Sequence, residues 1–93
     1  KNATAYNNRA YHRALARVDI QQAKDDIAKA LSLRGDDPAF IDTRGYLSYL
    51  DGDFKSALSD FDKSLKMAKE LGAGDEFTAE ILFHRGLVYK QLG

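Results

Sequence analysis

The ionisable side chains of this sequence stand at spacings that predict neither catalysis nor metal binding. Each of the two histidines, His12 and His84, lacks a Cys or a second His three or four positions away, so a solvent-facing or partly packed histidine is expected rather than a metal ligand. The carboxylate pairs Asp25-Asp26 and Asp36-Asp37 are chain neighbours, which point about 100° apart on a helix and do not converge for acid–base chemistry. We therefore predict that the chain is not an enzyme and has no catalytic residue, no metal site and no cofactor.

Composition excludes further classes of function. The 93 residues carry 14 Lys and Arg against 14 Asp and Glu, so the chain offers no basic field to a nucleic acid. Every apolar stretch falls far short of the ~18 residues that cross a bilayer, and no membrane partner is expected. The lack of cysteine fits reducing and oxidising compartments alike, so the location stays open, with a preference for the cytoplasm. A chain that starts at Lys1 instead of Met is expected to be a processed product or a piece of a longer protein.

An internal repeat organises the chain. At an offset of 34 residues five pairs are identical, and they cover a whole amphipathic segment. These pairs are Asp19 with Asp53, Ala23 with Ala57, Asp26 with Asp60, Lys29 with Lys63 and Leu31 with Leu65. A second series places an Arg before a small residue, at intervals of 35 and 41 residues: Arg9-Ala10, Arg44-Gly45 and Arg85-Gly86. The extra residues in these intervals are expected in turns or at helix ends.

Each repeat is interpreted as two helices, because apolar residues recur at i, i+3, i+4 and i+7 and no segment alternates as a strand does. About five helices are expected, near residues 3–17, 19–33, 38–50, 54–71 and 76–92. The expected N-caps are Asp37 before Pro38, Asp53 and Asp75, and the expected stops are Gly35 and Gly72. The fold class is therefore all-α, in a single domain over residues 1–93.

The chain resembles the tetratricopeptide repeat family. The most complete copy spans residues 38–71 and matches the family pattern at Gly45, Gly52-Asp53-Phe54, Ala57, Phe61 and Leu65. An earlier copy spans 4–37, with a turn from Leu15 to Asp19 that is one residue too long and has no Gly, and an incomplete copy spans 79–93. The resemblance implies an antiparallel helix-pair solenoid, an α-α superhelix, that acts as a scaffold for protein binding.

In such a solenoid the first helices of successive repeats line a concave surface, and this surface is the expected partner-binding site. The candidate residues share i, i+4, i+7 spacing on the three expected first helices: Asn7, Tyr11, Asp42, Tyr46, Tyr49, Phe83, Leu87 and Lys90. Asn7 and Asp42 have no evident packing reason to face this surface. The tyrosines suit binding or packing between helices, and both interpretations stay open. The expected partner is a peptide or helix of another protein.

One groove known in the family binds acidic chaperone tails through Lys, Asn and Arg side chains. This sequence departs from that clamp at Asn7 and Tyr11, at Thr43, and at Glu80 and His84. Because Glu80 would repel a carboxylate tail, no carboxylate clamp is expected.

The last helix has an apolar face at Leu82, Gly86 and Tyr89 that would lack the second helix of its own repeat. We expect a homodimer through this helix or a longer protein whose next helix covers it, unless a lengthened fourth helix satisfies it. An assembly segment without a free ligand is therefore the alternative to a peptide-binding module.

Overall fold

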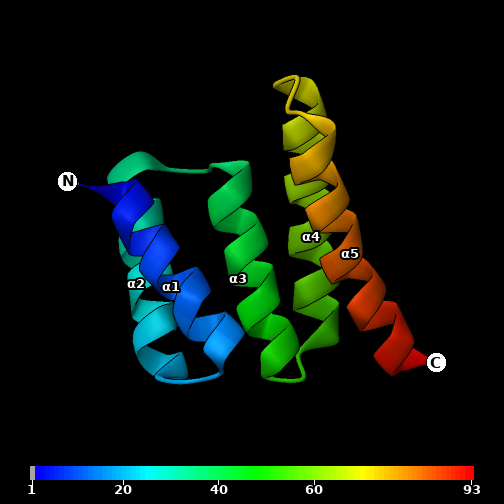
Figure 1. The fold of residues 1–93 in the computed structure, drawn as a ribbon, viewed down its shortest axis with the longest axis horizontal. Coiled ribbons are helices and arrows are strands. Elements are labelled where there is room, and N and C mark those ends of the chain that lie inside the picture. Colours follow the sequence, from blue (N-terminus) through cyan, green and yellow to red (C-terminus); the bar gives the residue numbers. More distant parts are fainter. Residues whose placement is uncertain (1) are drawn as a thin grey trace.

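A computed structural model describes residues 2–93, which form five α-helices and no strand (Figure 1). The helices are α1 (Ala3–Ala16), α2 (Ile20–Arg34), α3 (Pro38–Leu50), α4 (Phe54–Glu70) and α5 (Asp75–Leu92). Each boundary lies within one residue of the position expected from the sequence. The all-α class and the number of helices are therefore confirmed.

The helix starts follow from local capping chemistry. The carboxylates of Asp37 and Asp53 accept hydrogen bonds from the backbone N–H groups of Ala39 at 2.8 Å and Ser56 at 3.2 Å, as expected of N-caps. The prediction for the last helix was wrong by one residue, because Gly74 occupies the N-cap position and Asp75 is the first helical residue. Asp75 there lies at the positive end of the helix dipole, where a carboxylate is favoured without a capping bond.

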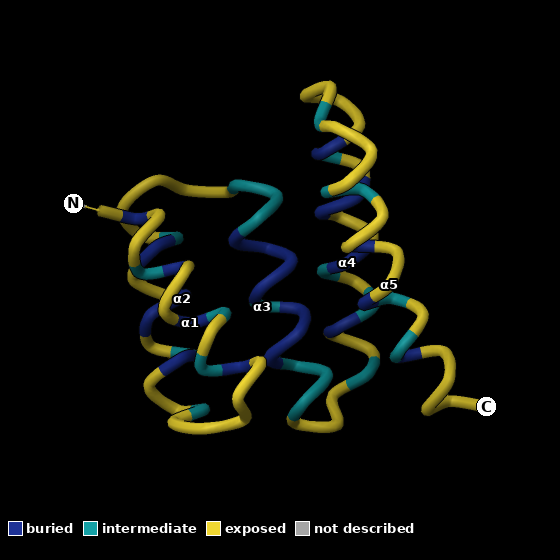
Figure 2. Tube along the Cα trace, in the orientation of Figure 1, coloured by how far each residue is buried: buried dark blue, intermediate teal, exposed yellow. Residues whose placement is uncertain are grey.

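Successive helices run antiparallel, and α3 lies at the centre of the molecule (Figure 1). It packs against α4 most extensively, and it also contacts α1, α2 and α5. Most of its middle is buried: residues 40–43 and 45–47 are dark in Figure 2, and only the half-buried Arg44 lies between them. Phe40, Ile41 and Leu47 of α3 are each at most 2% exposed. The surfaces that border α3 are therefore the ones whose geometry the core holds most firmly.

The crossing of α3 and α4 depends on a missing side chain. A Cβ atom added to Gly45 would lie 2.8 Å from Cε1 of Phe61, and Phe61 is fully buried. Helices approach this closely only where a side chain is absent or short. Gly45, one of the residues that match the family pattern, thus lies at the contact between the paired helices α3 and α4.

Candidate functional site

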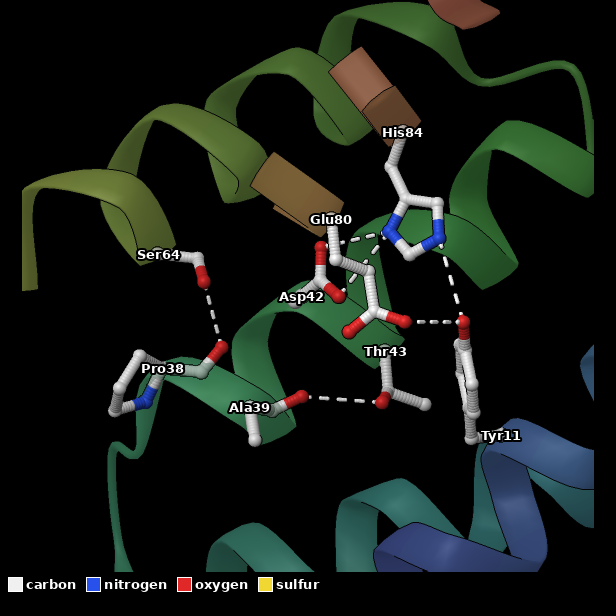
Figure 3. Close-up of polar contacts among 8 residues, drawn as sticks. All are labelled: Tyr11, Pro38, Ala39, Asp42, Thr43, Ser64, Glu80 and His84. Atoms are coloured by element: carbon white, nitrogen blue, oxygen red, sulfur yellow. Dashed lines mark hydrogen bonds and ion pairs between the residues drawn. The ribbon is translucent and has the colours of Figure 1, made fainter. Parts of the chain in front are cut away.

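The side chains of α1, α3 and α5 meet around a buried histidine–aspartate pair (Figure 3). His84 Nδ1 lies 3.1 Å from Oδ1 and 3.2 Å from Oδ2 of Asp42, and both residues are 3% exposed. Because the partner is a carboxylate, Nδ1 is the ring nitrogen that carries a hydrogen, so His84 donates and Asp42 accepts. The expectation of a solvent-facing or partly packed His84 was wrong, because α5 packs with this side chain directed at α3. His12 is exposed, as expected.

Tyr11 connects α1 to the same cluster. Its hydroxyl donates a hydrogen bond of 3.0 Å to Oε2 of Glu80, and it lies 3.5 Å from Nε2 of His84 (Figure 3). Burial, followed by the hydrogen bond to Glu80, raises the pKa of the Tyr11 hydroxyl well above its usual value. Tyr11 therefore keeps its proton at neutral pH and remains a donor to Glu80.

Burial also changes the acidity of Asp42. It raises the pKa of this carboxyl above its usual value, and the hydrogen bond from His84 offsets part of that rise. A buried carboxylate is costly unless it is paired, so the two residues hold α3 and α5 in one relative position. The pair is thus a structural element of the site as well as part of its wall.

Aromatic rings surround the histidine. The ring centroid of Tyr46 lies 4.9 Å from that of His84 and 5.9 Å from that of Tyr49, and Phe61 lies 5.8 Å from His84. Tyr46 is only 8% exposed, so packing between helices accounts for its position. Tyr49 is half-buried and also contacts Phe54, with centroids 6.1 Å apart. Of the two tyrosines of α3, only Tyr49 keeps an accessible surface for a partner.

A hollow of about 230 Å³ opens beside this cluster, between α1, α3 and α5. Its lining residues are Asn7, Asn8, Tyr11, Ala39, Asp42, Thr43, Phe77 and Glu80. Three of the residues predicted from the sequence, Asn7, Tyr11 and Asp42, come together here. Asn7 and Asp42 are nevertheless 8% and 3% exposed, so the expectation that no packing reason holds them was wrong. Asn7 on α1 and Asp42 on α3 are both buried by packing between helices, which their residue types did not indicate.

Other residues predicted for this surface lie outside the hollow. Phe83 and Lys90 are exposed, and Leu87 is half-buried against the core. On α5 the hollow is bordered by Phe77 and Glu80, and His84 lies one turn further along. One residue is about 100° of helix rotation, so choosing Phe83 instead of His84 placed the α5 stripe on a neighbouring face.

The residues that the site prediction missed include Thr43, Glu80 and His84 at its centre. All three occupy positions that correspond to the clamp of the tetratricopeptide family, but their residue types differ from those of the clamp. The i, i+4 spacing of Glu80 and His84 on α5 was the available signal for these two residues. Thr43 could not be interpreted from the sequence, because its hydroxyl donates to the Ala39 carbonyl at 3.0 Å within α3 (Figure 3).

No group of three or more potential metal ligands occurs among residues 2–93. Within that range no helix is both long and apolar enough to span a bilayer. The chain matches no family model, no curated protein and no solved structure. The arrangement of α1, α3 and α5 is consequently interpreted from the residues of this chain alone.

Proposed function

We propose that the chain is a non-catalytic protein-interaction module of the tetratricopeptide type, which binds a peptide or helix of a partner protein along α1, α3 and α5. The observation that carries this proposal is the hollow itself, which three helices distant in sequence form with polar side chains around it. Binding sites of helical proteins are commonly built between helices in this way. The half-buried Tyr11 and Tyr49 extend the surface with flat rings that carry a polar end.

A blocked hollow tests this function. Asn8 is exposed on α1 and lines the hollow, so Asn8→Trp fills it without disturbing the core. Gln22→Trp places the same ring on an exposed position of α2, outside the hollow, and is the matched control. We expect peptides selected from a random display library by the unmodified chain to lose affinity at least about tenfold with Asn8→Trp and to keep it with Gln22→Trp. Equal affinity for both variants, or a library that yields no binder, would contradict the proposal.

A second candidate function, assembly through the last helix, is favoured by a separate observation. Leu82 and Tyr89 on α5 are 42% and 52% exposed, and nothing lies within 4 Å of a Cβ atom added to Gly86. In α3 the residue at the corresponding Arg-Gly position, Gly45, is covered by Phe61 of α4. The bare face of α5 therefore suits another helix, from a second copy or from a longer chain.

Self-association is tested by sedimentation over about a hundredfold range of concentration around micromolar dissociation constants. Homodimerisation through α5 predicts a dimer that Tyr89→Glu weakens. The control Gln91→Glu adds the same charge at a neighbouring exposed position and should leave the dimer intact. A monomer at every concentration would exclude the homodimer and leave a covering helix from another chain segment as the remaining form of this function.

A further inference from the structure

The hollow between α1, α3 and α5 is acidic. Two of its lining residues, Asp42 and Glu80, are carboxylates, and none of the lining residues within the described range 2–93 is a Lys or Arg. The nearby His84 is already engaged with Asp42. A hollow of about 490 Å³ on the other side of α3 differs, since Arg44 and Lys55 line it together with Asp60. The two hollows therefore differ in the charge of their lining residues.

The hydroxyl and carboxylate groups of the hollow offer no free hydrogen-bond donor, which leaves the side-chain amides of Asn7 and Asn8 to donate. The hydroxyl hydrogen of Tyr11 goes to Glu80, and that of Thr43 goes to the Ala39 carbonyl. Both hydroxyls therefore offer only lone pairs to a ligand. When ionised, the carboxylates of Asp42 and Glu80 accept hydrogen bonds but cannot donate them. His84 supplies a single N–H to both oxygens of Asp42. Acceptors therefore outnumber donors in the hollow, so it favours a ligand that brings hydrogen-bond donors.

A buried amide provides an independent indication of a ligand. Asn7 lines the hollow and is 8% exposed, and its Oδ1 atom has no hydrogen-bond partner among the described residues. A buried acceptor without a partner costs free energy, and native structures contain few of them. The described residues supply no donor to this oxygen, and a ligand N–H that reaches the wall of the hollow at Asn7 would provide one.

From the charge, the excess of acceptors over donors and the unpartnered amide oxygen, we infer that the hollow binds the cationic end of a Lys or Arg side chain of the partner. Ammonium carries three donors and guanidinium five, and neither accepts. The rings of Tyr11 and Phe77 provide apolar walls for the alkyl stem and faces that attract a cation. This inference rests on the proposed interaction function and gives the partner segment a chemical class.

The test uses four small probes: the N-acetyl amides of arginine, lysine, norleucine and glutamate. Norleucine has an alkyl side chain like that of lysine without the charge, and glutamate reverses the charge. In two-dimensional NMR titrations we expect the arginine and lysine probes to shift the signals of Asn7, Tyr11 and Glu80, with weaker binding as salt is added. The norleucine and glutamate probes should leave these signals unchanged.

Two charge-removing variants sharpen the test. Glu80 is exposed, and Glu80→Gln keeps an acceptor for Tyr11, so the fold should persist while the affinity for the arginine probe falls about threefold. The control Asp25→Asn removes the same charge from an exposed position on α2 and should not alter binding. Asn7→Leu removes the unpartnered oxygen, so we expect an undiminished melting temperature together with weaker probe binding. A melting temperature that falls while probe binding is unchanged would assign Asn7 a purely structural role.

The outcomes separate this inference from the proposed function. The cationic preference would be overturned if the norleucine probe bound with the same affinity as the lysine probe, or if the glutamate probe bound more tightly than either. Library peptides that lack Lys and Arg but lose affinity for the Asn8→Trp variant would also overturn the cationic preference. They would still support the interaction module. Binding of the arginine probe, with no peptide selected from any library, would instead support the cationic hollow and contradict the module.

Discussion

Each of the two helix pairs, α1–α2 and α3–α4, is held together by an Arg–Asp contact of the same kind. Arg9 of α1 donates to both oxygens of Asp26 in α2 at 2.9 and 2.7 Å, and Arg44 of α3 donates to both oxygens of Asp60 in α4 at 3.0 and 2.9 Å. These arginines are 35 residues apart and these aspartates 34. A planar guanidinium bound to a carboxylate by two parallel bonds sets the register between two helices. The shared contact explains why the pairs are alike despite different cores.

The pairs differ in how they divide the volume at their crossing. The second pair has Gly45 against the ring of Phe61, whereas the first has Ala10 and Ile27 at the corresponding positions, both at most 3% exposed. A larger side chain on one helix is thus accompanied by a smaller one on the other. Close packing of the interior requires this compensation, since neither a void nor an overlap is tolerated without cost.

The turns of the two pairs differ as well. The turn from α3 to α4 has Gly52 at φ 80°, in the left-handed region that glycine adopts without strain. The turn from α1 to α2 places Arg17 at φ 56° and Asp19 at φ 50° in the same region. Side chains with a Cβ atom are disfavoured there by roughly 1–2 kcal/mol each. The turn without a glycine is therefore the more strained of the two.

Exchanging the volumes at the crossing should have the largest effect. Gly45→Ala places a Cβ atom against Phe61, and we expect it to lower the free energy of unfolding by about 1–3 kcal/mol despite the better helix propensity of alanine. Phe61→Ile alone leaves a cavity that costs about 1–2 kcal/mol. The double variant reproduces the residue types of the first pair. Urea unfolding should show that it is more stable than the sum of the single changes predicts, and strict additivity would refute the compensation.

The ionic contact of the first pair makes a pH-dependent contribution. The hydrogen bond from Arg9 holds the pKa of Asp26 below its usual value, so the unfolded state takes up the proton first as the pH falls. The stabilisation is therefore present above the usual pKa of about 4 and is lost as the pH falls through the lower pKa of the folded state. We expect Asp26→Asn to cost about 1 kcal/mol at neutral pH and little near pH 2.

The control for this contact is Asp25→Asn, which removes a neighbouring exposed carboxylate. Urea midpoints measured across the acid range should converge for Asp26→Asn and the unmodified chain but run parallel for Asp25→Asn. A loss that stays the same from neutral to acid pH would show that Asp26 stabilises the pair by packing alone.

The third pair of an Arg and a small residue, Arg85-Gly86, extends the comparison because Gly86 is uncovered. Gly86→Ala meets nothing within 4 Å, so helix propensity alone should act, and we expect a gain of about 0.5–1 kcal/mol. The same substitution at Gly45 should be destabilising. Thermal unfolding of the two variants at low concentration checks the opposite signs. A loss at Gly86 would mean that this face is already covered in solution.

Relief of the strained turn should have the smallest effect. Asp19 makes no side-chain capping bond, so Asp19→Gly removes the strain at φ 50° without losing a hydrogen bond. Its only cost is the greater conformational entropy of the unfolded chain. We expect a gain of about 0.5 kcal/mol, seen as a slightly higher melting temperature. In the other pair, Asp53→Gly loses the cap bond to Ser56 and should be destabilising by a few tenths of a kcal/mol. Equal signs for the two changes would contradict the difference between the turns.

Much of the fold was predictable because its determinants are local. Asp37 and Asp53 start helices with side-chain bonds to residues two and three positions away, and the apolar stripe of α4 follows from the period of the helix. The site was predicted less well. Tyr11, Asn7 and Asp42 were found, but the stripe on α5 was placed one residue from His84, a difference that periodicity does not resolve in a helix with apolar residues on several faces.

The five helices, the N-caps Asp37 and Asp53 and the repeated Arg and Asp positions follow from the sequence alone, since each depends on neighbours along the chain or on an internal offset. The burial of His84 against Asp42, 42 residues away, and near Tyr11, 73 residues away, arises from the packing of distant helices. The rotation of α5 about its own axis selects which side chains enter the cluster. That rotation is set by packing against α3 and α4, because the burial of a whole helix face outweighs the preference of any one of its residues.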